Sequence, residues 1–391
     1  MKIIVVASLA FSLVNFRGRL LKDMVANGHE VLACAPDDDR VVAAQLAAMG
    51  IGFRVMPMAR AGLNPLADLR TLAWLVSLFR SQRPDLVLAY TQKPIVYAGI
   101  ASRIVGGIRY FAMCSGLGHA FADQGAHWLR WLVAALYRVA LKRAEGVFVF
   151  NADDRGEMLR HHMIRPDTLV VQVPGTGVDL QYYTAVPVPP GPPRFLMISR
   201  LLSSKGLSEY VEAARRVRKR HPHVRFRLLG PPDPNPAGVG MVQIEAWAAE
   251  GVIEYLGEVR DVRPSLAAAS VFVLPSWYRE GLPRTILEAM AMGRPVITTD
   301  MPGCREPIEE GYNGLLVAPR NVDMLEAAIM RFVRQPGLAA TMGASARRTA
   351  IGRFSVQRVN EMLLSTMQLF APAGGVPLPP KLNGHAPHMA A

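Results

Sequence analysis

The stretch from Val271 to Thr298 constrains the fold more than any other part of the chain. Val271 to Leu274 is a short apolar run that predicts a buried strand. Apolar residues then recur at helical spacing as far as Pro295, and Pro283 supplies the fixed φ angle of a first helical turn. Pro295 to Thr298 predicts a second strand. This order is one βαβ unit of a parallel sheet, which binds ligands at the carboxyl ends of its strands.

The loop from Ser276 to Arg284 lies at this carboxyl edge. The helix that follows it offers unpaired backbone N–H groups and a partial positive charge, which together suit phosphate oxygens. Glu280 precedes the helix start, and Glu288 lies one to two turns inside the helix, within reach of a ribose whose diphosphate sits at that start. Two solvated glutamates on an amphipathic helix would have the same spacing, so the pair alone leaves both readings open.

The full string around these glutamates resembles a family signature. It reads EGLPRTILEAMAMGRPVITTDMPGCRE, followed by NGLLV at Asn313 to Val317. This string is similar to the C-terminal signature of retaining GT-B glycosyltransferases of the glycosyltransferase 4 family, closest to the capsular and exopolysaccharide branch with lipid-linked acceptors. The resemblance implies that Glu280 contacts the donor sugar and that Glu288 contacts the ribose. It also implies an α/β GT-B fold, with two Rossmann-like doubly wound domains facing a central cleft.

The length of 391 residues and the alternation of strands with helices also favour two doubly wound domains. We expect an acceptor-side Rossmann-like domain over residues 1–185, a stiff proline-rich linker over 186–193, and a nucleotide-sugar domain over 194–353. By resemblance, a helix over 354–370 returns to the N-terminal domain. The tail 371–391 is rich in Pro, Gly and Ala and is expected to be disordered.

The first residues allow two interpretations. Ile3 to Val6 predicts a buried strand and Ser8 to Arg17 the loop after it, but MKIIVVASLAFSLV also has the charged start and apolar core of a signal peptide. The family resemblance favours the strand. No uncharged apolar run reaches the roughly 20 residues that span a bilayer.

Further donor-binding residues follow from the resemblance. The pattern SRL-x3-KG places Arg200 and Lys205 before a helix that starts near Leu207, where the family binds and neutralises the nucleotide diphosphate. Two surface charges are the alternative. We expect both cations to share one cavity with the two glutamates. The resemblance adds the loop glycine Gly18, for which ordinary turn chemistry is an equal alternative, the backbone at Val259 as a contact to the base, and the helix start Gly281, Leu282, Pro283 and Arg284.

The acceptor is expected to enter beside Phe16, Arg17 and Arg19 and beside the loop CSGLGHAF, which contains His119. Many family members carry a loop histidine near the donor sugar, which makes His119 a catalytic candidate, although a lone histidine is more often structural. The branch that this chain most resembles often has an aromatic residue at that place.

The segment His127 to Gly146 predicts a basic amphipathic helix. Trp128, Trp131, Leu132, Leu136 and Val139 lie on its apolar side, and its basic residues are Arg130, Arg138, Lys142 and Arg143. Such a helix can lie in the interface of an anionic membrane. A helix packed on the sheet with solvated arginines fits the same pattern.

Composition bounds the partners and the compartment. The formal net charge of +13 suggests an anionic partner, but the chain lacks a nucleic-acid-binding motif. Three scattered cysteines without metal-ligand spacing favour a reducing cytosol. The paired aspartates Asp153 and Asp154 read as helix-capping residues, so we expect neither a metal nor another cofactor.

The sequence therefore predicts a cytoplasmic enzyme, peripheral at the inner face of the cell membrane. It would move a hexose or N-acetylhexosamine, with retention, from a nucleotide-sugar, chiefly a UDP-sugar, to a lipid-linked or polysaccharide precursor of surface polysaccharide. Two alternatives are a nucleotide-sugar epimerase on the same architecture and a non-catalytic nucleotide- or glycan-binding module.

Overall fold

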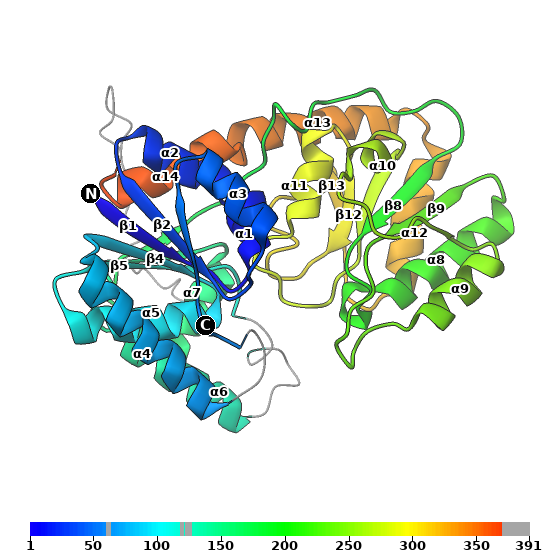
Figure 1. Ribbon diagram of the computed structural model, residues 1–391. Helices are drawn as coiled ribbons and strands as arrows, with labels where there is room; N and C mark the ends of the chain where they lie inside the picture. The colour runs from blue at the N-terminus through cyan, green and yellow to red at the C-terminus, as the bar shows by residue number, and fades with distance from the viewer. Residues whose placement is uncertain (60–63, 118–120, 122–126, 370–391) are drawn as a thin grey trace, which may run out of the picture. The chain divides into compact units, whose positions relative to one another are not determined.

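The computed structural model describes residues 1–59, 64–117, 121 and 127–369 and divides into two compact units. Unit 1 comprises Met1–Thr176 together with the described residues from Gln357 onward, and unit 2 comprises Gly177–Val356. The tail 371–391, for which disorder was predicted, lies outside the described residues. Figure 1 shows one parallel sheet in each unit, with helices on both faces.

Unit 1 is built on a parallel sheet of seven strands in the order β3-β2-β1-β4-β5-β6-β7. The apolar runs at the centre of the sheet are fully buried, as a sheet covered on both faces requires. The strands are β1 (Lys2–Val6), β2 (Glu30–Ala35), β3 (Gly52–Val55), β4 (Leu86–Tyr90), β5 (Arg109–Cys114), β6 (Gly146–Val149) and β7 (Val170–Gln172).

The helices of unit 1 form two layers. One face of the sheet carries α4 (Pro65–Gln82), α5 (Gln92–Val105) and α6 (His127–Leu141), with α5 packed against both of its neighbours (Figure 1). The helices α1 (Ala10–Asn15), α2 (Gly18–Ala26), α3 (Arg40–Ala48) and α14 (Val356–Thr366) lie toward the other face, and α7 (Ala152–Arg160) follows β6. The basic helix predicted over 127–146 is confirmed but ends at Leu141.

The prediction of a loop over residues 8–17 is wrong. Residues 10–15 form α1, in which Ala10 and Leu13 are buried at helical spacing. The carboxylate of Asp37 accepts a hydrogen bond from the backbone N–H of Ala10 at 2.7 Å. A cap supplied from after the next strand is a tertiary contact, which the local sequence did not indicate.

The capping role predicted for Asp153 and Asp154 is also wrong. The residue that caps α7 is Asn151, whose side-chain oxygen accepts from the backbone N–H of Asp154 at 2.7 Å. Both aspartates lie in the first turn of the helix, where their charge complements the helix dipole. The capping position had been placed too late in the chain.

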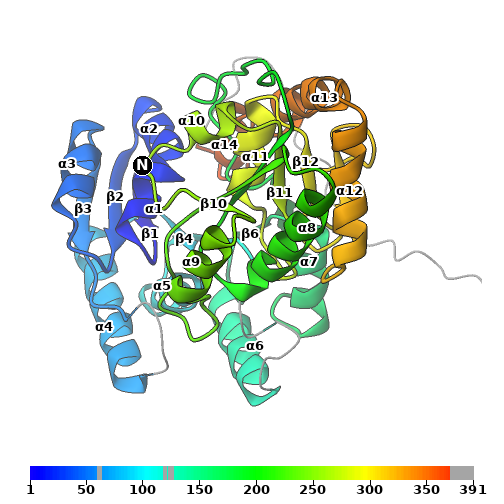
Figure 2. The ribbon, with the colours of Figure 1, turned by 90° about the vertical axis from the view of Figure 1, so that its right-hand side faces the viewer.

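Unit 2 is a second parallel sheet, of six strands in the order β10-β9-β8-β11-β12-β13. Its strands are β8 (Arg194–Ile198), β9 (Arg225–Leu229), β10 (Glu254–Tyr255), β11 (Val271–Leu274), β12 (Val296–Thr299) and β13 (Gly314–Val317). Figure 2 shows α8 (Leu207–Arg220) beside α12 (Val322–Arg334) on one side of this sheet. The remaining helices are α9 (Met241–Ala249), α10 (Arg263–Ala267), α11 (Arg284–Ala291) and α13 (Leu338–Arg353).

The βαβ unit predicted between Val271 and Thr298 is confirmed. β11 and β12 pair in parallel, with Phe272 opposite Val296, and α11 connects them. Pro283 is the residue that caps α11 rather than a member of its first turn. One side of α11 is fully buried, which fixes the helix on the sheet and its N-terminal end at the carboxyl edge.

Candidate functional site

The strand order of unit 2 reverses between β8 and β11. One half of the sheet runs outward from β8 and the other from β11, so the loops after these two strands diverge at a topological switch point. Open α/β sheets bind ligands at such a point, outside the carboxyl ends of the strands. The loop after β8 contains Lys205, and the loop after β11 contains Glu280. Topology alone thus selects these two loops.

Lys205 and Glu280 form an ion pair at this switch point. The ammonium of Lys205 donates to Oε1 of Glu280, and both side chains are 14% exposed. The hydroxyl of Ser276 donates to the same carboxylate oxygen at 3.0 Å. The expected meeting of these two charges is confirmed. Two donors on one oxygen fix the orientation of the carboxylate at the edge of the sheet.

Close backbone packing holds the two loops together. The backbone N–H of Trp277 donates to the carbonyl of Ser204 at 3.1 Å. Gly206 has a φ of 80°, and a Cβ there would lie 2.1 Å from the carbonyl oxygen of Pro275. Only glycine therefore lets the turn that contains Lys205 lie against the end of β11.

The N-terminal end of α11 lies directly after Glu280 in the chain. Its capping residue is Pro283, whose side chain cannot accept a hydrogen bond from the first turn. The preceding loop packs against Gly303, where a Cβ would lie 2.3 Å from the carbonyl oxygen of Glu280. The segment Gly281 to Arg284 thus brings the N-terminal end of α11 to the switch point, and the partial positive charge of a helix N-terminus favours an anion.

Glu288 lies on α11, and its side chain is buried. Its Oε1 accepts from the hydroxyl of Tyr183 and from Nε of Arg284, each at 2.8 Å. Burial raises the pKa of this carboxyl, while Arg284 and the hydrogen bond from Tyr183 act in the opposite direction. The contact of Glu288 with a ribose stays a prediction.

Arg200 points to a different partner from the one expected. Its guanidinium donates to Oδ2 of Asp233 at 2.6 Å, and its side chain is 58% exposed while that of Asp233 is buried. Arg200 and Glu288 thus have partners of their own, Asp233 and Tyr183, and the expectation that all four charges share one cavity stays a prediction. The role of Arg200 in binding a diphosphate stays a prediction.

Val259 and Gly18, two further residues predicted to bind the nucleotide-sugar donor, belong to different units. Val259 follows β10 in the loop after Gly257, and the carbonyl of Gly257 accepts from the N–H of Gly230 at 2.8 Å. Gly18 begins α2 in unit 1, and a Cβ there would meet only ordinary contacts at 3.8 Å. Neither assignment is tested by these positions.

Unit 1 has its own switch point, between β1 and β4. The guanidinium of Arg17, the capping residue of α2, lies 4.4 Å from the centre of the Tyr90 ring and 5.9 Å from that of Phe150. Phe16 ends α1 at the surface, and Arg19 pairs with Asp23 at 3.4 Å. The predicted acceptor residues thus lie around the junction of α1 and α2, with the Arg17 guanidinium over the rings of Tyr90 at the end of β4 and Phe150 after β6.

Other predicted features are not described or not tested. His119 lies outside the described residues. Within the described ranges, no group of three or more His, Cys, Asp or Glu side chains is arranged to hold a metal. Burial raises the pKa of the Cys304 thiol to about 12, and the negative charge of Glu280 acts in the same direction, so this thiol beside the ion pair stays protonated.

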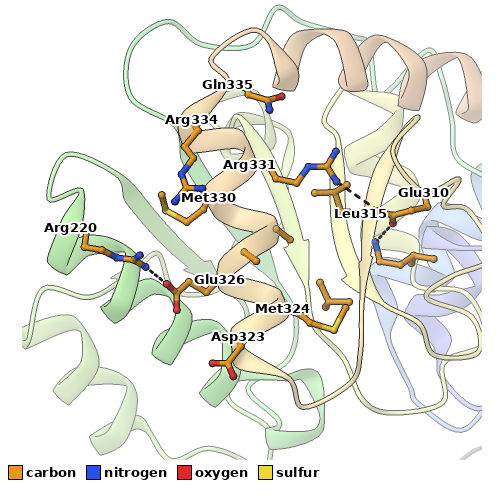
Figure 3. Close-up of a pocket in the computed structure, with 14 residues that line it drawn as sticks. Arg220, Glu310, Leu315, Asp323, Met324, Glu326, Met330, Arg331, Arg334 and Gln335 are labelled. Atoms are coloured by element: carbon orange, nitrogen blue, oxygen red, sulfur yellow. Dashed lines mark hydrogen bonds and ion pairs between the residues drawn. The ribbon is translucent and has the colours of Figure 1, made fainter.

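A pocket of unit 2 lies away from the switch point. It is formed by α12 and β13 and lined by ion pairs, among them that of Arg220 with Glu326 (Figure 3). Arg331 and Glu310 lie 3.9 Å apart at its other side. Its lining contains none of the predicted site residues, and β13 is an edge strand away from the switch point. We therefore assign the site to the switch point on topology and charge.

Three residues of the site were missed from the sequence: Tyr183, Asp233 and Ser276. Ser276 is the first polar residue after β11, so its place at the carboxyl edge was a usable signal. Asp233 lies in a proline-rich loop and Tyr183 more than a hundred residues before its partner. For those two, only the fold shows the pairing.

Comparison with known families decides what such a two-unit arrangement belongs to. Residues 15–175 match the model described as "Glycosyl transferase 4-like domain", and residues 192–335 match "Glycosyl transferases group 1". The chain belongs to the glycosyltransferase 4 family. The two matches fall on the sheets of units 1 and 2, and the second contains both Lys205 and Glu280.

Relatives of this transferase act in the assembly of glycans. It is 26% identical, over 87% of its length and 91% of the other protein, to N,N'-diacetylbacillosaminyl-diphospho-undecaprenol alpha-1,3-N-acetylgalactosaminyltransferase of Campylobacter jejuni. It is 32% identical to the putative colanic acid biosynthesis glycosyltransferase WcaL of Salmonella typhimurium, over 51% of each chain.

Solved structures of similar proteins share the fold of the transferase. HepE from Anabaena, in complex with UDP, has a TM-score of 0.77 and 21% identity, over 95% of this chain and all of that one. Sucrose-phosphate synthase from Thermosynechococcus elongatus has a TM-score of 0.78 and 18% identity, over 94% of this chain and 98% of that one. The predicted GT-B architecture, with two Rossmann-like units, is thereby confirmed.

Proposed function

We propose that this transferase moves a sugar from a UDP-sugar to a lipid-linked or polysaccharide precursor, with retention of configuration and without a metal ion. The observation that carries the proposal is the Lys205–Glu280 ion pair in the loops before and at the N-terminal end of α11. The named substrate of the Campylobacter relative and the UDP in the HepE complex support the choice of acceptor and donor.

The charges of unit 2 supply what nucleotide-sugar transfer needs. Negative charge grows on the diphosphate as its bond to the sugar breaks, and the ammonium of Lys205 and the N–H groups of α11 stabilise it. Glu280 accepts hydrogen bonds from the hydroxyls of the sugar and orients its ring. The acceptor hydroxyl attacks the anomeric carbon on the side that the diphosphate leaves, and the leaving phosphate takes the proton.

The donor, the absence of a metal and the alternatives are tested by one experiment. The purified transferase, treated with EDTA, is incubated with a panel of UDP-sugars and a polyprenyl-diphosphate saccharide. We expect transfer of one sugar at an unchanged rate, because Lys205 and α11 supply the positive charge that a metal ion would otherwise provide. Loss of transfer in EDTA would contradict the metal-free mechanism.

The products of the same incubation separate the alternatives. An epimer or a free sugar formed without the acceptor would indicate an epimerase. Tight UDP binding without any turnover would indicate a binding module. NMR of the anomeric proton in the product reports whether configuration is retained, and an inverted linkage would remove that part of the proposal.

The surface of unit 1 supports a peripheral place at an anionic membrane. On α6, Trp128 is 62% and Trp131 is 73% exposed, and residues 127–141 include no acidic side chain. Leu66 and Leu69 are exposed on α4, which covers the same face of the sheet (Figure 2). Among the described helices, none combines the length and the apolar character needed to cross a bilayer. An exposed indole pair on a basic helix suits the headgroup layer.

We expect the double variant Trp128→Ser/Trp131→Ser to lose most of its binding to vesicles that contain phosphatidylglycerol. Its indoles are the large apolar groups available for insertion, while each nearby Lys or Arg adds only roughly 1 kcal/mol of attraction. Co-sedimentation measures binding, and Val242→Ser, at an 83% exposed valine of α9 in unit 2, is the control. Unchanged co-sedimentation of the double variant would contradict the membrane proposal.

A further inference from the structure

The segment from Val178 to Pro187 enters unit 2 ahead of its first strand and is fixed by two arginines of that unit. Arg347 donates to the carbonyl of Tyr183 at 2.9 Å, and Arg294 donates to the carbonyl of Pro187 at 3.0 Å. Arg294 is fully buried. This entry segment, residues 178–187, is therefore anchored along its length on unit 2.

The entry segment is shaped to present Tyr183. The carboxylate of Asp179 accepts from the N–H groups of Gln181 and Tyr182, and the N–H of Tyr183 donates to the carbonyl of Asp179 at 2.8 Å. The ring of Tyr182 packs edge-on against that of Tyr183, with the guanidinium of Arg263 3.8 Å from its centre. The Tyr183 side chain is thus held in one direction, toward α11.

The hydroxyl of Tyr183 meets Glu288 at Oε1, the oxygen that also accepts from Arg284. Burial and the charge of Glu288 raise the pKa of Tyr183, so this phenol is a neutral donor. Within the described part of the chain, the other carboxylate oxygen, Oε2, accepts no hydrogen bond. One oxygen of Glu288 is therefore tied to the protein by two donors, and the other remains for a ligand.

We propose that Tyr183 is a positioning residue for donor binding, which holds Oε1 of Glu288 so that Oε2 accepts from the ribose hydroxyls of the nucleotide. The proposal rests on the proposed function, a transferase that takes a UDP-sugar donor, and on the predicted contact of Glu288 with the ribose of that donor. It adds to that function a residue more than a hundred positions before Glu288 in the chain, supplied by the entry segment. A carboxylate free to rotate would bind the same hydroxyls less well, because ordering it costs conformational entropy.

The variant Tyr183→Phe tests the proposal, because it removes one oxygen and leaves the ring in place. Calorimetry measures Kd for UDP and for 2′,3′-dideoxy-UDP, which lacks the ribose hydroxyls. The variant is expected to weaken UDP binding roughly three- to tenfold and to leave dideoxy-UDP binding unchanged, since the loss concerns one hydrogen-bonded contact. In steady-state kinetics, KM for the donor rises while kcat stays near its native value.

Tyr182→Phe, at the neighbouring half-exposed ring, is the matched control and is expected to leave both affinities unchanged. Equal weakening of UDP and dideoxy-UDP by Tyr183→Phe would overturn the proposal, since a purely structural role would not distinguish the two ligands. Unchanged affinity for UDP would overturn it as well.

Glu288→Gln separates this proposal from the proposed function. If Glu288→Gln loses the preference for UDP over dideoxy-UDP but Tyr183→Phe keeps it, Glu288 reads the ribose and Tyr183 does not position it. If Glu288→Gln keeps the preference, the ribose contact itself is wrong, and the role of Tyr183 falls with it. Transfer of sugar by the native protein is measured separately and is affected by neither result.

Discussion

Glu280→Ala is expected to lower kcat by on the order of 10²-fold or more while the protein stays folded, because loss of a positioning contact misplaces the reacting sugar. The carboxylate is fixed by Lys205 and Ser276 and lies just before the helix start that we assign to the diphosphate. UDP affinity, measured by calorimetry, should change far less than kcat, because Glu280 is assigned to the sugar and not to the nucleotide.

Two further variants sharpen this prediction. Glu280→Gln keeps the shape and can still accept from Ser276, so a loss of turnover in this variant reports the charge rather than an empty space. The control for removing a charge from unit 2 is Glu254→Gln. Glu254 lies on β10, and its exposed carboxylate pairs with Arg227 of β9. If Glu280→Ala turns over at a near-native rate, Glu280 does not belong to the site.

The part of the fold that the sequence predicted best is the part decided by local pattern. The runs Ile3 to Val6, Val271 to Leu274 and Pro295 to Thr298 were predicted as strands, and β1, β11 and β12 lie within one residue of the predicted bounds. Helix α6 was likewise predicted to begin at His127, where it is observed to begin. In these segments, residue propensity, burial and boundary residues all indicate the same element, so its type and bounds could be predicted.

The errors fall where a distant group decides the local structure. Residues 10–15 are helical because Asp37, from after β2, caps the first turn and the sheet buries one side. The cap of α7 is Asn151, but the local sequence offers Asp153 as an equally good capping residue. A capping partner from a distant part of the chain cannot be predicted from the sequence of the helix. Where several polar residues precede a helix, the sequence does not decide which of them is the cap.

The candidate site divides in the same way. The string around Glu280 and the basic residue of the SRL-x3-KG pattern were enough to predict that Lys205 and Glu280 meet, because each lies in the loop directly after a strand. Arg200 and Glu288, which were predicted to share the cavity, pair with Asp233 and Tyr183, two partners that the sequence did not indicate. Position in the chain fixes which edge of the sheet a side chain reaches. The partners within reach then decide its direction.

Lys205→Ala is expected to lower kcat/KM by roughly 10- to 150-fold, since a charge-assisted hydrogen bond to the leaving diphosphate contributes about 1.5–3 kcal/mol. The loss should appear in kcat more than in donor KM, because the charge on the diphosphate grows as the bond breaks. Lys205→Arg should recover part of the rate, since it restores the charge with a different shape.

Lys2→Ala, which removes the ion pair with Glu30 (3.1 Å) at the amino ends of β1 and β2, is the control for losing a paired lysine. A similar loss in both alanine variants would mean that the effect reports stability. An unchanged rate in Lys205→Ala would contradict the assigned role, because the ammonium paired with Glu280 would then not act on the leaving diphosphate.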